Sequence, residues 1–133
     1  MGSVTFEDVT ALVEGDNPGS ILVVDVRSTE EFSHGRIPWS VCIPLPSLPE
    51  AFALEPLQFQ QKFGVDKPQP ADDIVVTCRQ AGQELFMKSH YFRLGGRAVK
   101  GCELLQSLGF TGAQAYRGSM DEWRQRGGTV ETD

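Results

Sequence analysis

Cys78 stands at the place in this chain that best suits nucleophilic chemistry. It follows an apolar run, Ile74 to Thr77, and precedes Arg79 and a glycine-containing stretch. A thiol between a buried strand and the N-terminus of a helix lies among backbone N–H groups, and these favour the thiolate. The same N–H groups, with the forked donors of an arginine, can bind an anion. The pattern predicts a reactive cysteine beside an anion site; the alternative is an inert thiol at a strand end.

The chain offers two alternative loops for that anion site. The first begins at Arg79, directly after the cysteine, and contains Gly82. The second begins fourteen residues later at Arg93 and leads into the next helix. The residues that complete it are Gly95, Gly96 and Arg97. We expect one of these two loops to hold the substrate anion.

The elements that must position the cysteine follow an alternating order. Short β-rich runs alternate with longer amphipathic segments, which indicates an α/β fold with helices on both faces of a mainly parallel sheet. We expect five strands, at 4–6, 21–26, 41–43, 74–77 and 113–116. We expect helices over 7–14, from Ser28 to near Gly35, over 50–63 with a break at Pro56, over 97–108 and over 118–126. Ser28 and Glu31 have the types and spacing of a capping box at the start of the second helix, and Gly109 is expected to end the fourth. Ligands bind beyond the carboxyl ends of parallel strands, and Cys78 and residues 25–27 both follow such ends.

The charge balance argues against a nucleic-acid partner. The 133 residues carry 12 Lys and Arg against 18 Asp and Glu, a net charge of −6, with no basic block. An acidic chain would have to concentrate its few cations to bind a phosphate backbone. We therefore expect no nucleic-acid partner. The length suits a single domain, residues 1–133, and we expect it to be a monomer.

Cysteine usage and hydropathy bear on the compartment. Three cysteines and two histidines are widely spaced, which predicts no metal site and suits a reducing compartment. The sequence shows no apolar run long enough for a membrane span and no secretory leader. We expect a cytoplasmic protein, with the mitochondrion as the alternative.

Several segments together resemble the signatures of the rhodanese family, and most closely its single-domain thiosulfate sulfurtransferases. Residues 25–32, 34–38 and 43–44 look like the first signature, and 74–79 look like the catalytic strand and cysteine. Residues 107–110 and 116–123 look like the closing signature. The resemblance covers nearly the whole chain and implies the rhodanese three-layer fold.

The resemblance also implies a mechanism that needs no cofactor. The Cys78 thiolate would attack the sulfane sulfur of thiosulfate, release sulfite and keep the sulfur as a persulfide. A thiol such as glutathione or thioredoxin, or cyanide in the test tube, would then accept the sulfur. Such two-step nucleophilic catalysis predicts ping-pong kinetics.

The family pattern reveals a departure within the catalytic loop. Family members follow the cysteine with two residues, a glycine, one more residue and a basic residue. If residues 79–92 are removed, Cys78 joins Arg93 and this pattern is met through Arg97. We therefore interpret 79–92 as a fourteen-residue insertion. Residues 79–84 can themselves form the cradle, or the insertion projects and holds the second loop too far away.

Other residues have both a functional and a structural interpretation. In the family, Asp25 and Arg27 tie the catalytic loop to the neighbouring strand; the alternative is a surface ion pair worth less than about 1 kcal/mol. Ser119 is a candidate to approach the loop, and Trp39 either narrows the cleft or packs. We interpret the remaining cysteines, at 42 and 102, as inert buried thiols.

Two other functions fit parts of the pattern. The phosphatase branch of the fold needs an arginine six positions after the cysteine, where this chain has Glu84, and a carboxylate would repel phosphate. The second alternative is a non-catalytic rhodanese-fold module in which the insertion disables the loop. Reaction of Cys78 with thiosulfate separates that module from an enzyme.

Overall fold

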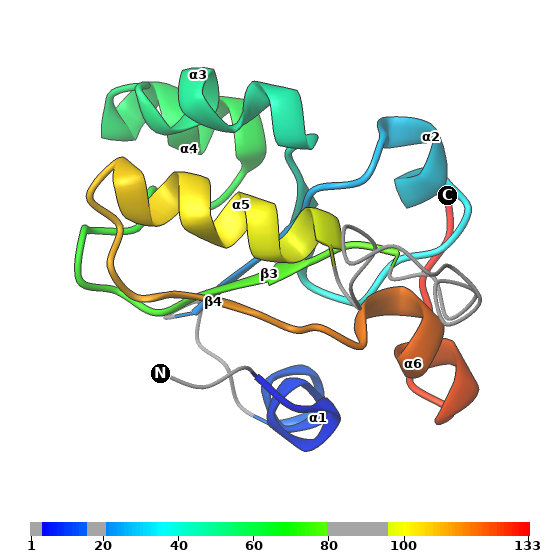
Figure 1. Cartoon of the computed structure of the whole chain (residues 1–133). Coiled ribbons are helices and arrows are strands. Elements are labelled where there is room, and N and C mark those ends of the chain that lie inside the picture. The colour runs from blue at the N-terminus through cyan, green and yellow to red at the C-terminus, as the bar shows by residue number, and fades with distance from the viewer. Residues whose placement is uncertain (1–3, 16–20, 80–95) are drawn as a thin grey trace.

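A four-stranded parallel sheet forms the middle of the protein (Figure 1). The structure is a computed structural model, and it describes residues 4–15, 21–79 and 96–133. The strands are β1 (Leu22–Asp25), β2 (Ser40–Cys42), β3 (Ile74–Thr77) and β4 (Ala113–Ala115), in the order β2-β1-β3-β4. The central strands β1 and β3 are buried along their whole length, as expected for parallel strands covered on both faces.

Helices cover both faces of this sheet, which confirms the predicted fold class. The described residues form α1 (Phe6–Glu14), α2 (Thr29–Ser33), the 3-10 helix η1 (Leu45–Ser47), α3 (Leu48–Phe52), α4 (Pro56–Phe63), α5 (Gly96–Ser107) and α6 (Ser119–Gln125). Figure 1 shows α3, α4 and α5 on one side of the sheet and α1 and α6 on the other. None of these helices combines the length and the apolarity needed to cross a lipid bilayer.

Alternating residues of the central strands build two separate cores. Val24 and Val76 face a core with residues of α3, α4 and α5, including Leu105. Val23 and Val75 face the opposite core, where Trp123 of α6 and residues of α1 pack. Both strands are therefore fixed from two sides, and so are the chain segments that follow their carboxyl ends.

Local sequence signals explain most element boundaries. Pro56 begins α4, so the apolar segment expected over 50–63 becomes two helices, because proline suits a first helical position but not an interior one. Gly109, at φ +100°, ends α5 as expected. The expected edge strand over 4–6 is shorter than predicted. Val4 alone pairs with Tyr116, because Thr5 already caps α1.

Candidate functional site

Cys78 is the first residue after β3 and lies at the carboxyl edge of the sheet. Only 1% of its surface is exposed. Its backbone is held by the start of α6: the Cys78 N–H donates to Ser119 Oγ at 2.9 Å, and the Cys78 carbonyl accepts from the N–H of Met120 at 3.0 Å. The thiol is thus fixed between a central strand and the last helix.

Ser119 is a buried side chain whose place beside Cys78 the sequence indicates only weakly. It is fully buried, and its Oγ lies 3.6 Å from Cys78 Sγ and 2.6 Å from the carbonyl oxygen of Tyr116. Its φ of +52° is uncommon for a residue other than glycine. The sequence signal for this residue was the Gly118-Ser119 pair within the closing signature, but the contact joins residues that lie 41 positions apart in the chain.

Asp25 and Arg27 form a buried ion pair, so the surface-pair interpretation is wrong. Their side chains are 0% and 4% exposed, and Arg27 Nη2 lies 2.7 Å from Asp25 Oδ2. Nε of Arg27 donates to both carboxylate oxygens, and Nη2 also donates to the carbonyl of Gly35 at 2.7 Å. Asp25 pairs with Thr77 across the sheet, one residue before Cys78. Removing one member of such a pair costs about 3–5 kcal/mol.

Arg97 lies in the first turn of α5, and Gly96 is the first residue of that helix. The Arg97 guanidinium donates two hydrogen bonds to the carboxylate of Glu31 in α2, at 3.0 and 3.1 Å. The hydrogen bond from Arg97, aided by one from the Ser28 N–H, lowers the pKa of Glu31 to about 2. The same contact raises the pKa of Arg97, which also interacts electrostatically with Cys78 and Asp25. Arg97 is therefore held by Glu31, and the charge of Cys78 contributes to its raised pKa.

Arg79 is more loosely placed than the other two arginines. Its side chain is 55% exposed, and its Nε lies 4.0 Å from Oδ1 of Asp121 on α6. The Arg79 carbonyl accepts from the Asp121 N–H at 3.0 Å, so its backbone is fixed although its side chain reaches solvent.

The rest of the predicted loop lies outside the described residues. These positions are Gly82, Arg93 and Gly95, together with residues 80–92 of the expected insertion. The described residues bring Cys78, Arg79, Arg97 and the Asp25–Arg27 pair to one edge of the sheet. Which of the two loop starts forms the anion cradle stays a prediction.

The other two cysteines are poorly suited to act as nucleophiles. Burial, and then the charge of Asp25, raises the pKa of Cys42 to about 11; its Sγ donates to the carbonyl of Arg27 at 3.6 Å. Burial raises the pKa of Cys102 to about 12. Both pKa values favour the neutral thiol at physiological pH.

Within the described residues, Trp39 lies away from Cys78. It precedes β2, at the edge of the sheet opposite Cys78, and 72% of its surface is exposed. Neither interpretation made from the sequence holds for it.

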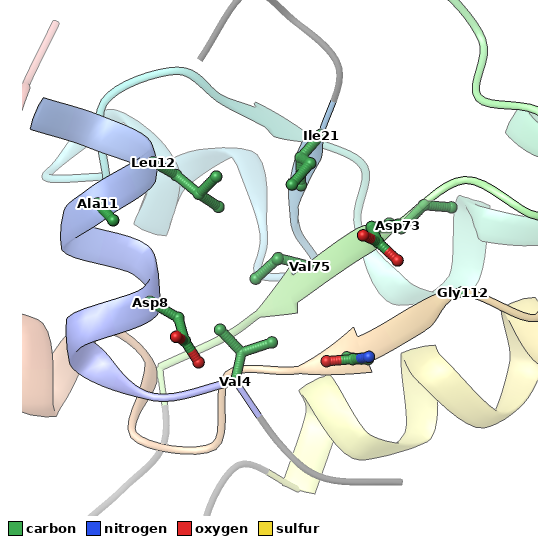
Figure 2. A pocket seen from close by; sticks show the side chains of 10 residues that line it. Val4, Asp8, Ala11, Leu12, Ile21, Asp73, Val75 and Gly112 are labelled. Atoms are coloured by element: carbon green, nitrogen blue, oxygen red, sulfur yellow. The ribbon is translucent and has the colours of Figure 1, made fainter. Parts of the chain in front are cut away.

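A pocket of about 280 Å³ lies at that opposite edge, between α1 and the starts of β3 and β4 (Figure 2). Leu12 and Val75 line its apolar part, and Asp8 and Asp73 add carboxylates. Because it opens at the amino ends of the strands, this pocket is separate from the cysteine site.

The fold and the site together define an α/β protein with a buried cysteine at the carboxyl end of a central parallel strand. Arginines that form ion pairs with carboxylates lie at the same edge of the sheet. The chain belongs to the rhodanese-like domain family, whose sequence model matches residues 5–126.

Relatives of known name match along most of their length. The chain is 34% identical over 126 residues to the thiosulfate:glutathione sulfurtransferase of Saccharomyces cerevisiae, covering 95% of this chain and 80% of that protein. It is 32% identical over 124 residues to the mitochondrial thiosulfate sulfurtransferase RDL2 of the same yeast, covering 93% and 73%. Its structure resembles that of the human single-domain sulfurtransferase TSTD1, with a TM-score of 0.74 and 29% identity over 95% of this chain and 97% of that one.

Proposed function

We propose that this protein is a thiosulfate sulfurtransferase that carries sulfur as a persulfide on Cys78. The observation that supports this most directly is a buried cysteine at the carboxyl end of a central parallel strand, in a chain whose relatives are named sulfurtransferases.

The proposed first step transfers one sulfur atom to the enzyme. The Cys78 thiolate attacks the outer sulfur of thiosulfate and forms a new S–S bond. The S–S bond of thiosulfate breaks, and sulfite leaves with the electron pair. The total charge is unchanged, so no oxidant is needed.

The second step returns the enzyme to its starting state. An acceptor thiolate attacks the outer sulfur of the persulfide, and the Cys78 thiolate leaves. We propose glutathione as the acceptor because the first yeast relative is named for it; thioredoxin is a further candidate. Cyanide serves as a test acceptor and gives thiocyanate.

Other residues would bind the sulfonate end and support the loop. We assign anion binding to Arg79, Gly82 and the second loop start, and loop support to the Asp25–Arg27 pair. The residues of the second loop start are Arg93, Gly95, Gly96 and Arg97. We place the reaction of this monomer in the cytoplasm, with the mitochondrion as the alternative in view of the mitochondrial relative.

Mass spectrometry of the intact protein after incubation with thiosulfate tests the proposal. We expect the wild type to gain one sulfur atom and Cys78→Ser to gain none. A variant lacking residues 79–92 serves as a second arm. If that variant gains sulfur and the wild type does not, the insertion blocks the site; if neither gains sulfur, Cys78 is not a sulfur carrier.

A further inference from the structure

Glu31 is an acidic residue in a site that must receive an anion. Both of its carboxylate oxygens bond the guanidinium of Arg97, although the two residues lie 66 positions apart in the chain. This geometry ties α2 of the first signature to the first turn of α5.

The carboxylate of Glu31 is itself fixed in place. Its Oε1 accepts from the backbone N–H of Ser28 at 3.1 Å and from the Ser28 hydroxyl at 3.2 Å. Ser28 in return accepts from the N–H of Glu31, which completes the capping box of α2. Because the carboxylate cannot swing away without giving up the helix cap, Arg97 meets a preorganised partner.

The pair lies within electrostatic range of the reactive thiol. Arg97 interacts with Cys78 and Asp25 as well as with Glu31. On the neighbouring strand, Cys42 feels the charges of Asp25, Arg27 and Glu31. The negative charge of Glu31 therefore affects the pKa of other groups at this edge of the sheet.

Three of the arginines that the structure describes at this edge of the sheet have carboxylate partners. Arg27 has Asp25, Arg79 has Asp121, and Arg97 has Glu31. The first pair is buried and closed, whereas the side chains of Arg97 and Glu31 are 41% and 32% exposed. An incoming anion meets the partly exposed Arg97 only together with the negative charge of Glu31.

We infer that Glu31 sets the charge preference of the sulfur donor: by holding Arg97 and offsetting its charge, it weakens binding of a dianion relative to a monoanion. This inference rests on the proposed sulfurtransferase function and adds a residue that acts through Arg97. Glu31 is a positioning residue and does not touch the transferred sulfur.

Two donors that differ by one charge make the inference measurable. Thiosulfate is a dianion, and methanethiosulfonate is a monoanion with the same transferable outer sulfur. With the second donor, the Cys78 thiolate forms the same persulfide, the donor S–S bond breaks, and methanesulfinate leaves with the electron pair. The ratio of kcat/KM for the two donors isolates the response to charge.

The matched variant is Glu31→Gln, because glutamine also completes a capping box and removes only the charge. We expect the ratio for thiosulfate over methanethiosulfonate to rise roughly three- to tenfold, mainly through a lower KM for thiosulfate. Glu30→Gln removes the same charge from the exposed preceding position and should leave the ratio within about a factor of two. In an Arg97→Gln background, Glu31→Gln should lose the part of its effect that depends on holding Arg97 and keep only the direct effect of removing the carboxylate charge.

An unchanged or lower ratio in Glu31→Gln would overturn the inference, as would an equal rise in Glu30→Gln. A second readout needs no sulfur transfer. Iodoacetate and iodoacetamide both alkylate the thiolate, so the ratio of their rates at Cys78 reports local charge and not the thiolate fraction. Glu31→Gln should raise this ratio even if wild type and variant transfer no sulfur, a result that would reject the proposed function alone. If neither reagent reaches Cys78, the inference fails too.

Discussion

At the scale of single residues, the hydroxyl of Ser119 has one proton and two acceptors within reach. Its Oγ lies 2.6 Å from the Tyr116 carbonyl and 3.6 Å from Cys78 Sγ, while it accepts from the Cys78 N–H. When Cys78 carries negative charge, the hydroxyl gains by turning its proton towards sulfur, because hydrogen bonds to charged groups are the stronger ones. Ser119 is therefore suited to steady the thiolate and the leaving sulfur.

Replacement of Ser119 by glycine tests this role without straining the backbone, since glycine accepts its φ of +52°. We expect persulfide formation from thiosulfate to slow by about tenfold, the equivalent of a charged hydrogen bond worth about 1.5 kcal/mol. Rapid-quench mass spectrometry in a single turnover measures the rate.

Ser107→Ala is the control for Ser119→Gly, because the Ser107 hydroxyl also donates to a backbone carbonyl, that of Leu104, but on the surface of α5. It should react at the wild-type rate. A Ser119→Gly variant that gains sulfur as fast as this control would remove Ser119 from the mechanism.

At the scale of elements, Glu31 and Arg97 join two helices through one ion pair, and this pair responds to pH. The pKa of Glu31 falls from its usual 4.5 to about 2 in the folded protein, first because of the hydrogen bond from Arg97. The unfolded chain therefore binds more protons, so the stabilisation is present above about pH 4.5 and is lost as the pH falls towards 2.

Unfolding in urea at pH 5.5 and at pH 2.5, followed by tryptophan fluorescence, measures this contribution. We expect the wild type to lose about 1 kcal/mol more than Glu31→Gln between the two conditions, a value reduced for the partly solvated pair. Equal losses would mean that the ion pair adds nothing to stability.

The sequence predicts the local features of these elements better than it predicts the contacts between them. The capping box of Ser28 and Glu31, the break at Pro56 and the end of α5 at Gly109 all follow from short-range rules and are confirmed. The partner of Arg97 was not predicted, because spacing along a chain gives no register between helices 66 residues apart. The resemblance to the family suggested that Asp25 and Arg27 cooperate, but only the folded sheet shows that they are buried.

At the scale of the whole molecule, the last residues tie the closing helix to the first signature. Glu131 and Arg36 exchange two backbone hydrogen bonds, and the carbonyl of Thr129 accepts from the indole of Trp123 at 2.6 Å. Arg36 also pairs with Asp133 at 2.8 Å. The loop so held includes Gly35, whose carbonyl fixes Arg27.

Removal of residues 129–133 should therefore act on both stability and the site. We expect the free energy of unfolding to fall by about 2 kcal/mol, from the lost hydrogen bonds and the newly exposed indole. Denaturant unfolding and a red shift of tryptophan emission measure the change. A matched Asp133→Asn variant, which keeps the backbone bonds and removes one surface charge, should change stability by less than about 0.5 kcal/mol. A truncated chain as stable as this control would show that residues 129–133 do not stabilise the fold.

The contact between Cys78 and Ser119 has a consequence for how the protein is made. During synthesis, β3 emerges long before β4 and α6, yet it pairs with β4, and its cysteine takes its hydroxyl and amide partners from α6. A growing chain that ends before α6 has the thiol but neither partner. A chain that stalls or ends before α6 therefore presents Cys78 without the two contacts that fix its backbone in the folded domain, and we expect it to load sulfur more slowly than the folded domain.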